Sequence, residues 1–318
     1  MDAAAVREAA ARIAGRVHRT PVLGSATLEE RTGARLAIKN EAVQRTGSFK
    51  ARGALNRLLT LDREALARGL VGVSAGNHAA ALAWAAAQVG AKATVVMPVG
   101  ANARKVAACR GYGAKVVLHG DTTGEAFAEC ERLRRERGLT FVHPFDDPMV
   151  LAGQGTAGLE LAEDAGPLDL LVVPVGGGGL ISGMALAVRA ASPSCRVVGV
   201  EPDGAATLRA ALAAGEPVPI VPQSVADGLC APFAGRFTLG LVRELVDDLV
   251  TLSETELLAG TRFVLERMKV VAEPAGAAAV GALLAARVPG AAGARVGAVI
   301  SGGNLDLAAV VPMLPDDL

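Results

Sequence analysis

Residues 46–54 read TGSFKARGA, which places Lys50 after a short polar turn and one aromatic residue, directly before an alanine-rich segment that we predict to be helical. A lysine in apolar surroundings loses its proton easily, because burial penalises the ammonium form. Only the neutral amine can attack an aldehyde, so this is a suitable position for a lysine that forms a Schiff base. Taken alone, the motif is weak evidence, because most lysines near a helix start are solvated surface charges. Its meaning depends on the rest of the chain.

The chain repeats one pattern: a short run rich in β-branched residues, a glycine-rich or polar turn, and an alanine- and leucine-rich segment. The runs are 69–73, 93–97, 115–118, 170–175, 196–200 and 295–300. Strands that alternate with helices predict parallel sheets and an α/β fold. Two consecutive units end alike, in Gly90-Ala91-Lys92 and Gly113-Ala114-Lys115, which favours neighbouring units of one small sheet. Because no low-complexity linker divides the chain, we expect a large domain of residues 1–55 and 146–318, into which a small αβ domain, 56–145, is inserted.

The composition argues against several classes of function. Lys plus Arg and Asp plus Glu both number 32, so the formal net charge is zero, and nucleic acid or an anionic membrane surface is not an expected partner. The four cysteines lie far apart, without the close pairs of a zinc site or a disulfide framework. They are Cys109, Cys130, Cys195 and Cys230. Reduced thiols in a cytoplasmic protein are the simplest interpretation.

No segment is predicted to be a signal peptide or a membrane span. Residues 1–17 carry charges at helical spacing, which indicates an amphipathic helix. The two long uncharged stretches are 69–91 and 170–188. Polar residues interrupt the first, and Pro174 and four glycines interrupt the second, so both are interpreted as strand, loop and helix of a folded core.

In open parallel sheets, ligands bind beyond the carboxyl ends of the strands, so the residues after each expected strand are candidates for a site. Four such junctions are chemically unusual: Ser74-Ala75-Gly76-Asn77-His78, Gly176-Gly177-Gly178-Gly179, Ala272-Glu273-Pro274 and Ser301-Gly302-Gly303-Asn304. Free backbone N–H groups in the segment Ser74 to His78 could hold a carboxylate. The glycines Gly176 to Gly179 would let the backbone close around a phosphate.

Each junction also has a purely structural interpretation. Ser74 and Asn77 could only cap a helix. Glu273 could be a charge in a first helical turn, and Ser301 a buried hydroxyl with a hydrogen-bond partner. For His78 the structural interpretation is preferred, because no proton that it must move can be identified.

Taken together and in this order, the motifs resemble those of the serine/threonine dehydratases, which are fold-type II pyridoxal-phosphate enzymes. The resemblance rests on Glu41, Gln44, the segment Thr46 to Lys50 with Arg52-Gly53-Ala54, the segment Ser74 to His78, Gly176 to Gly179, Ala226-Asp227-Gly228, Glu273-Pro274 and Ser301 to Asn304. It covers nearly the whole chain. It implies two parallel-sheet, three-layer αβα domains with the active site between them, pyridoxal 5'-phosphate bound by the larger domain, and a homodimer.

The resemblance also implies a role for each motif. Lys50 would hold the cofactor covalently and then serve as the general base. Asn77 would donate to the ring hydroxyl, and Ser301 would face the pyridine nitrogen. The phosphate would be bound by Gly176, Gly177, Gly178, Gly179 and Leu180. The cofactor site would further include Phe49 and Glu273. The substrate would contact Ser74, Ala75, Gly76, Asn77, His78 and Gly228.

The implied reaction is the dehydration and deamination of L-threonine, L-serine or both to a 2-oxo acid and ammonia. The alternative substrate is 3-hydroxyaspartate or another hydroxy amino acid from a catabolic pathway. A serine at the ring nitrogen cannot stabilise a pyridinium as an aspartate would, which favours prompt loss of the β-substituent. Pocket walls are expected from residues 44–46, 145–148 and 224–229.

Departures from the family pattern narrow the range of expected activities and of expected regulation. Ala75 stands where related racemases have a second serine, so racemisation should be weak or absent. Metal-dependent members would use Glu201 and the carbonyl of Ala205 with an acidic residue that is Thr207 here, so a metal is not expected. The sequence stops soon after the last predicted strand, so feedback control through a carboxyl-terminal regulatory domain is not expected either.

Two other classes of function stay open. A nicotinamide-dependent oxidoreductase needs glycines spaced G-x-G-x-x-G, and the registers from Gly176 and Gly177 would require glycine where Ile181 and Ser182 stand. A non-catalytic amino-acid-binding module would keep the carboxylate turn but would have no use for Lys50. Cofactor absorbance that is lost on borohydride reduction distinguishes these options.

Overall fold

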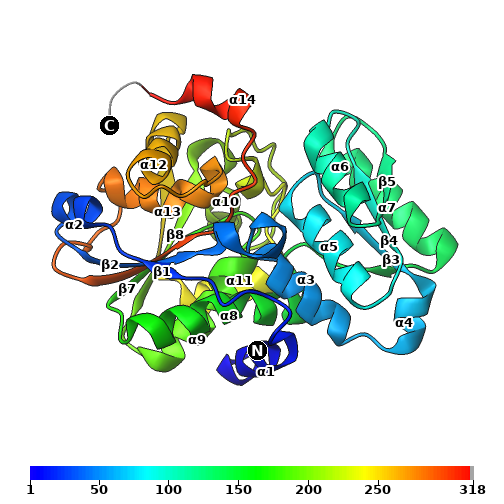
Figure 1. The fold of residues 1–318 in the computed structure, drawn as a ribbon, viewed down its shortest axis with the longest axis horizontal. Helices are drawn as coiled ribbons and strands as arrows, with labels where there is room; N and C mark the ends of the chain where they lie inside the picture. Colours follow the sequence, from blue (N-terminus) through cyan, green and yellow to red (C-terminus); the bar gives the residue numbers. More distant parts are fainter. Residues whose placement is uncertain (316–318) are drawn as a thin grey trace.

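The computed structural model describes residues 1–315, which form two sheets of unequal size (Figure 1). The six-stranded sheet has the order β1 (Val22–Leu23), β2 (Arg35–Asn40), β10 (Arg295–Ile300), β7 (Leu170–Pro174), β8 (Arg196–Pro202), β9 (Asp248–Leu252). The four-stranded sheet has the order β5 (Lys115–Leu118), β4 (Ala93–Met97), β3 (Leu70–Val73), β6 (Thr140–Phe141). Neighbouring strands run parallel except for β1 and β2. The predicted pair of parallel sheets is confirmed.

The strands of the small sheet all lie in the sequence between β2 and β7, so the small sheet interrupts the chain of the large one. Helix α3 (Lys50–Leu59) lies where the two parts meet and packs against α5 (Asn77–Gln88) and α8 (Pro148–Ala165) (Figure 1). It runs without interruption across position 55, and the expected domain boundaries at 55 and 145 stay a prediction.

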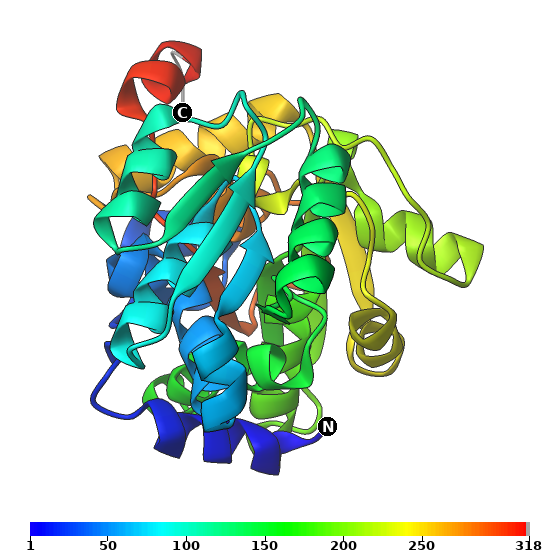
Figure 2. The same cartoon turned by 90° about the vertical axis from the view of Figure 1, so that its right-hand side faces the viewer.

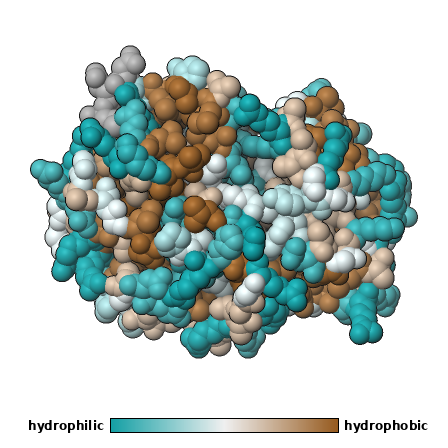
Figure 3. Space-filling model, in the orientation of Figure 1, coloured by the Kyte–Doolittle hydropathy of each residue, from teal (hydrophilic) through white to brown (hydrophobic). Residues whose placement is uncertain are grey.

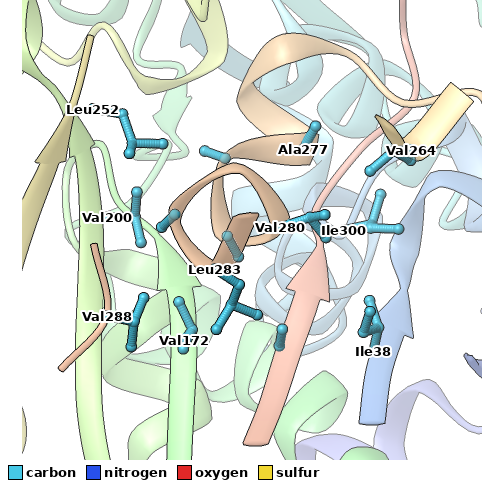
Figure 4. Packing of buried hydrophobic residues seen from close by; sticks show 14 of the residues in the cluster. Ile38, Val172, Val200, Leu252, Val264, Ala277, Val280, Leu283, Val288 and Ile300 are labelled. Carbon is cyan, nitrogen blue, oxygen red and sulfur yellow. The ribbon is translucent and has the colours of Figure 1, made fainter. Parts of the chain in front are cut away.

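Helices cover both faces of the large sheet. They are α2 (Ala26–Thr32), α8, α9 (Gly179–Ala191), α10 (Thr207–Ala214), α11 (Arg236–Leu245), α12 (Glu254–Glu266) and α13 (Pro274–Leu284). Two further helices lie outside these layers: α1 (Ala3–Ile13) packs on α8 and α9, and α14 (Leu307–Val310) packs on the turn that follows it. Side chains alternate between the faces, as the period of a strand requires. In β7, Val172 packs with α12 and α13 (Figure 4), whereas Leu171 and Val173 pack with α8, α9 and α11. The predicted three layers are confirmed for this sheet.

The small sheet is also covered on both faces (Figure 2). Its other helices are α4 (Arg63–Arg68), α6 (Ala103–Gly111) and α7 (Thr123–Arg137). Leu70 and Val95 pack against α3, α5 and α6, whereas Val71 and Val96 pack against α7. Single 3₁₀ turns complete the described elements: η1 (Glu41–Val43), η2 (Arg45–Gly47), η3 (Asp203–Ala205), η4 (Asp227–Leu229) and η5 (Val311–Met313). Within residues 1–315, none of the helices has the length and apolar character that crossing a bilayer requires.

One expected strand is absent. The sequence analysis places Glu273 just after a strand that ends at Val271, but residues 269–273 form no regular element, and Val271 is 55% exposed. The apolar pair Val270-Val271 suggested a strand, yet no neighbouring strand pairs with it. The position of Glu273 is set instead by its backbone N–H, which donates to the carbonyl of Gly302 at 3.2 Å.

Candidate active site

Two loops that are far apart in the sequence meet at the carboxyl end of β10. Ser48 and Gly302 form an isolated antiparallel bridge. The N–H of Phe49 donates to the carbonyl of Ser301 at 3.1 Å, and the N–H of Gly303 donates to that of Gly47 at 2.9 Å. Lys50, the first residue of α3, is thereby held at the edge of the large sheet.

The side chain of Lys50 has the properties of a reactive amine. Its Nζ donates to the carbonyl of Pro144 at 2.8 Å and lies 5.0 Å from the centre of the Phe49 ring. Burial lowers the pKa of Lys50 from its ordinary value of 10.5 to about 8. A substantial fraction of this amine is therefore neutral near physiological pH, which is what attack on an aldehyde and removal of a proton both require.

The four glycines connect β7 to α9, which begins at Gly179. Gly178 has a φ of +91°, a conformation that residues with a side chain rarely adopt. A Cβ atom on Gly177 would lie 2.4 Å from ring atoms of Phe145. The loop therefore has no room for side chains, and its backbone N–H groups and those of the first helical turn can face an anion.

Asn77, the first residue of α5, is held from two sides. Its Nδ2 donates to Oε1 of Glu273 at 2.5 Å, and its Oδ1 accepts from Nδ2 of Asn304 at 2.7 Å. Burial, and then the charge of Asp227, raises the pKa of the Glu273 carboxyl to about 7, against the effect of the Asn77 donor. Glu273 is thus not a solvated first-turn charge but a buried group that orients Asn77.

The buried His78 and the partly buried His143 border the same region, and both are neutral at physiological pH. Nε2 of His78 lies 3.1 Å from the carbonyl oxygen of Val142, and burial lowers the pKa of His78 to about 3. Burial also lowers the pKa of His143 to about 4. Its Nδ1 accepts the N–H groups of Phe145 at 3.2 Å and Asp146 at 2.8 Å, as only an unprotonated nitrogen can. These contacts are structural.

One cavity of about 320 Å³ collects the predicted residues. It is lined by every residue that the sequence analysis assigned to cofactor or substrate: Phe49, Lys50, Ser74, Ala75, Gly76, Asn77, His78, Gly176, Gly177, Gly178, Gly179, Leu180, Gly228, Glu273 and Ser301. The roles assigned to them individually stay predictions. The hydroxyl of Ser301, which is buried, donates to the carbonyl of Ala275 at 3.4 Å.

The cavity also has lining residues that the sequence analysis did not identify. They are Val73, Lys105, Thr123, Pro144, Pro174, Cys230, Ala231, Pro232 and Ala275. Pro144 follows β6, a strand of two residues whose apolar run is too short to be recognised in the sequence. Of the expected wall segments, Phe145 and residues 227–229 line the cavity, whereas residues 44–46, 146–148 and 224–226 do not. The amide of Gln44 bonds instead to the backbone N–H and carbonyl of His18.

The residues considered for a metal lie outside this cavity. The carboxylate of Glu201 accepts the backbone N–H groups of Leu208 at 2.7 Å and Arg209 at 3.1 Å, at the start of α10. The hydroxyl of Thr207 donates to the carbonyl of Ala231 at 2.7 Å. In the part of the chain that the structure describes, no group of three or more His, Cys, Asp or Glu side chains is placed to hold a metal ion.

The residues present fit a phosphate-bearing aromatic aldehyde. The glycine loop accepts no Cβ and ends at a helix start, as a phosphate site requires. Lys50 supplies an amine of lowered pKa in the same cavity, and Asn77 and Ser301 supply neutral hydrogen-bonding groups. Such a set of groups can hold the aldehyde covalently and leave a second amine-bearing molecule within reach of Lys50.

Comparisons with known proteins agree with this geometry. The family model described as pyridoxal-phosphate dependent enzyme matches residues 13–302. The chain is 45% identical to an L-threo-3-hydroxyaspartate ammonia-lyase of Pseudomonas sp, over 95% of each chain. It is 42% identical to the catabolic L-threonine dehydratase of Escherichia coli (strain K12), over 95% of this chain and 93% of that one. The structure of maize serine racemase superposes with a TM-score of 0.93 at 38% identity, covering 98% of this chain and 96% of the other.

Proposed function

This chain belongs to the pyridoxal-phosphate-dependent enzymes, in which it is an ammonia-lyase or dehydratase acting on a hydroxy amino acid, and we propose that its substrate is L-threonine, L-serine or both. The products would be a 2-oxo acid and ammonia. The observation that carries the proposal is the position of the Lys50 amine, whose pKa is lowered to about 8, in one cavity with the glycine loop and the turn Ser74 to His78.

The residues that would hold pyridoxal 5'-phosphate are Lys50, Asn77, Ser301 and the loop Gly176 to Gly179 with Leu180. When bound, the cofactor supplies an electron sink for the electron pair that remains on the α-carbon after its proton is removed. Ser301 can donate only a neutral hydrogen bond to the pyridine nitrogen, so it does not stabilise a protonated ring. This property supports prompt loss of the β-hydroxyl group.

The remaining steps use side chains and backbone groups of this chain. The N–H groups at the start of α5, beside Ser74 to His78, would hold the α-carboxylate of the substrate. The neutral amine of Lys50 would take the α-proton, because its pKa near 8 lets it accept a proton and release it again in each cycle. The β-hydroxyl would leave as water, and the protons balance when Lys50 gives up the proton that it took from the α-carbon. The enamine that remains tautomerises and is hydrolysed by one water molecule to the 2-oxo acid and ammonia.

The experiment that tests this proposal measures 2-oxo acid release from L-threonine, L-serine and L-threo-3-hydroxyaspartate, with the cofactor absorbance recorded on the same sample. Release from L-threonine or L-serine, equal with and without EDTA, would support the proposal. Cofactor absorbance without 2-oxo acid from either one would refute the substrate assignment and favour 3-hydroxyaspartate or another catabolic hydroxy amino acid, whichever is turned over.

We also propose that the chain forms a homodimer in the cytoplasm. Apolar side chains gather on the face that carries α12, α13 and α14 (Figure 3, oriented as Figure 1). Exposed large apolar residues of the chain include Val43, Val271, Leu307, Val311 and Met313. The location is supported by the four cysteines, which are all free thiols. Sedimentation equilibrium tests the assembly, and a monomer at micromolar concentration would contradict it.

A further inference from the structure

We propose that the side-chain end of this site accepts a neutral, apolar β-substituent, such as the methyl group of threonine, and rejects a carboxylate such as that of 3-hydroxyaspartate. The proposal rests on the proposed function, because it concerns the same cavity, and it narrows the substrate class. The part of the lining that carries it consists of Thr123, Phe145, Cys230, Ala231 and Pro232, and is called the side-chain wall below.

The other surfaces of the cavity already have assigned partners. The turn Ser74 to His78 would hold the α-carboxylate, Lys50 would face the α-carbon, and the glycine loop would hold the phosphate. The lining that remains consists of the side-chain wall, the ion pair between Lys105 and Asp227, and further uncharged residues, and we assign the side-chain wall to the β-substituent. The uncharged residues are Val73, Pro144, Pro174, Leu229 and Ala275. The chemistry of the side-chain wall therefore decides which β-substituents can be bound.

The side-chain wall is backed by an aromatic cluster. The Phe145 ring packs edge-to-face on His143, with ring centres 4.6 Å apart, and on Phe233 at 6.0 Å. Phe233 packs in the same way on Phe127 at 6.4 Å, and Phe127 packs on Phe141 at 6.0 Å. These contacts place neutral rings behind Phe145, including the uncharged imidazole of His143, so this part of the wall carries no charge and its rings are held by their neighbours.

The thiol in the side-chain wall is also uncharged. Sγ of Cys230 donates to the backbone carbonyls of Ser224 at 3.9 Å and Ala226 at 3.7 Å. Burial raises the pKa of Cys230 to about 11, so the thiolate is not formed near neutral pH. Cys230, Ala231 and Pro232 thus present sulfur and carbon atoms to the cavity without a side chain that strongly donates a hydrogen bond.

The positive groups near the cavity already have partners. Among the described lining residues, Lys50 and Lys105 are the two cationic side chains, and Nζ of Lys105 is paired with Oδ2 of Asp227. The Glu125 carboxylate accepts the N–H groups of Asp121 at 2.8 Å and Thr122 at 3.0 Å, and it thereby places a negative charge at the start of α7, which Thr123 begins. A carboxylate against the wall would lose its water without gaining a cation, whereas a methyl group would gain apolar contact.

Overall sequence identity does not distinguish a threonine substrate from a 3-hydroxyaspartate substrate. Relatives named for 3-hydroxyaspartate and for threonine are 45% and 42% identical to this chain over nearly equal lengths. The overall identity therefore does not indicate which β-substituent this chain accepts, and we infer the preference from the uncharged side-chain wall.

The first test uses two amino acids that cannot lose water because they lack the β-hydroxyl. L-2-aminobutyrate carries the methyl group of threonine, and L-aspartate carries the carboxylate of 3-hydroxyaspartate. Their dissociation constants for the cofactor-loaded enzyme are measured from the change in cofactor absorbance. We expect L-2-aminobutyrate to bind at least tenfold more tightly. L-Aspartate that binds equally or more tightly would overturn the proposal.

This readout does not depend on catalysis, so the two proposals can fail separately. If L-2-aminobutyrate binds more tightly but neither L-threonine nor L-serine gives a 2-oxo acid, the proposed function is wrong and the preference of the site for an apolar substituent is upheld. If L-threonine is dehydrated but L-aspartate binds more tightly, the proposed function holds and the inference about the wall is wrong.

The second test introduces a cation into the side-chain wall. Ala231→Arg adds a guanidinium, and Ala231→Met adds a side chain of similar length without charge. Relative to Ala231→Met, we expect Ala231→Arg to shift the ratio of the two dissociation constants at least tenfold toward L-aspartate. Equal ratios in the two variants would show that residue 231 does not face the β-substituent and would overturn the assignment of the wall. If Ala231→Arg does not fold, the wild-type comparison still decides the proposal.

Discussion

Replacement of Arg52 by methionine should destabilise the protein strongly, because Arg52 is the centre of a buried charge cluster next to Lys50. Its Nε donates to Oε2 of Glu41 at 2.7 Å and its Nη2 to Oε1 of the same carboxylate at 2.8 Å. Its Nη1 donates to Glu160 at 2.7 Å, and Glu160 also pairs with Nζ of Lys39 at 2.7 Å. The positive charges of Arg52 and Lys39 balance the negative charges of the two glutamates. The side chains of Arg52, Glu41 and Lys39 are fully buried.

The size of the effect follows from the charge that is left behind. Without Arg52, two carboxylates share one cation, Lys39, and one of the two, Glu41, is fully buried. Burial by itself would raise the pKa of Glu41, and the charge and hydrogen bonds of Arg52 hold that pKa below its ordinary value. Removal of one partner of a buried ion pair costs about 3–5 kcal/mol. With a urea dependence of roughly 3 kcal/mol per molar, the unfolding midpoint should fall by about 1 M or slightly more.

The assay is urea unfolding followed by far-ultraviolet circular dichroism, with Arg132→Met as the matched control. Arg132 makes ion pairs of similar length with Glu129 at 2.7 Å and Glu136 at 2.5 Å, but its side chain is 51% exposed, so its removal should hardly change the midpoint. The double variant Arg52→Met, Glu41→Gln restores neutrality and should recover part of the loss. The reasoning is refuted if Arg52→Met shifts the midpoint no more than Arg132→Met does, or if the double variant is less stable than Arg52→Met.

Three further predictions concern the cavity. Lys50→Ala should abolish 2-oxo acid release and leave the circular dichroism spectrum unchanged, because it removes both the attachment point of the cofactor and the base that takes the α-proton. Full activity in this variant would refute the mechanism. Ser301→Asp should slow elimination, because a carboxylate favours a protonated pyridine ring; a wild-type rate would contradict this account of Ser301. The rate at which the apoprotein takes up pyridoxal 5'-phosphate should rise with pH around an apparent pKa of about 8, because the amine of Lys50 is neutral above its lowered pKa. A midpoint near 10.5 would show that the amine is not desolvated.

Much of the fold could be predicted because buried parallel strands have a local signature. Strands covered on both faces read as continuous apolar runs, and five of the six runs found in the sequence correspond to such strands, β3, β4, β7, β8 and β10. The sixth run corresponds to β5, an edge strand without a fully buried residue. The strands that were not identified lack such a run. β1 and β6 have two residues each, β2 contains the buried Lys39, and β9 begins with Asp248. The partner that makes Lys39 acceptable in a core, Glu160, lies in a distant helix.

The candidate site was predictable where its residues occur in motifs. The lysine turn, the asparagine turn and the glycine loop each belong to a contiguous segment, and all of them line the same cavity. Lys105, Thr123 and Ala231 belong to no motif, because they reach the cavity only through the docking of the small sheet on the large one. Glu273 was identified, but its role in holding Asn77 depends on a 2.5 Å contact between the starts of two helices, α5 and α13, that are remote in the sequence.

The sequence by itself determined the parallel α/β architecture, the family, and which motifs line the cavity, among them the lysine turn and the glycine loop. These properties depend on the order and local chemistry of residues in short segments. Only the tertiary structure decided that burial lowers the pKa of Lys50 to about 8, that Asp227 neutralises Lys105, and that Phe145 and Ala231 form an apolar wall. Desolvation and charge pairing depend on distances between residues that are remote in the sequence, and those distances exist only after the chain has folded.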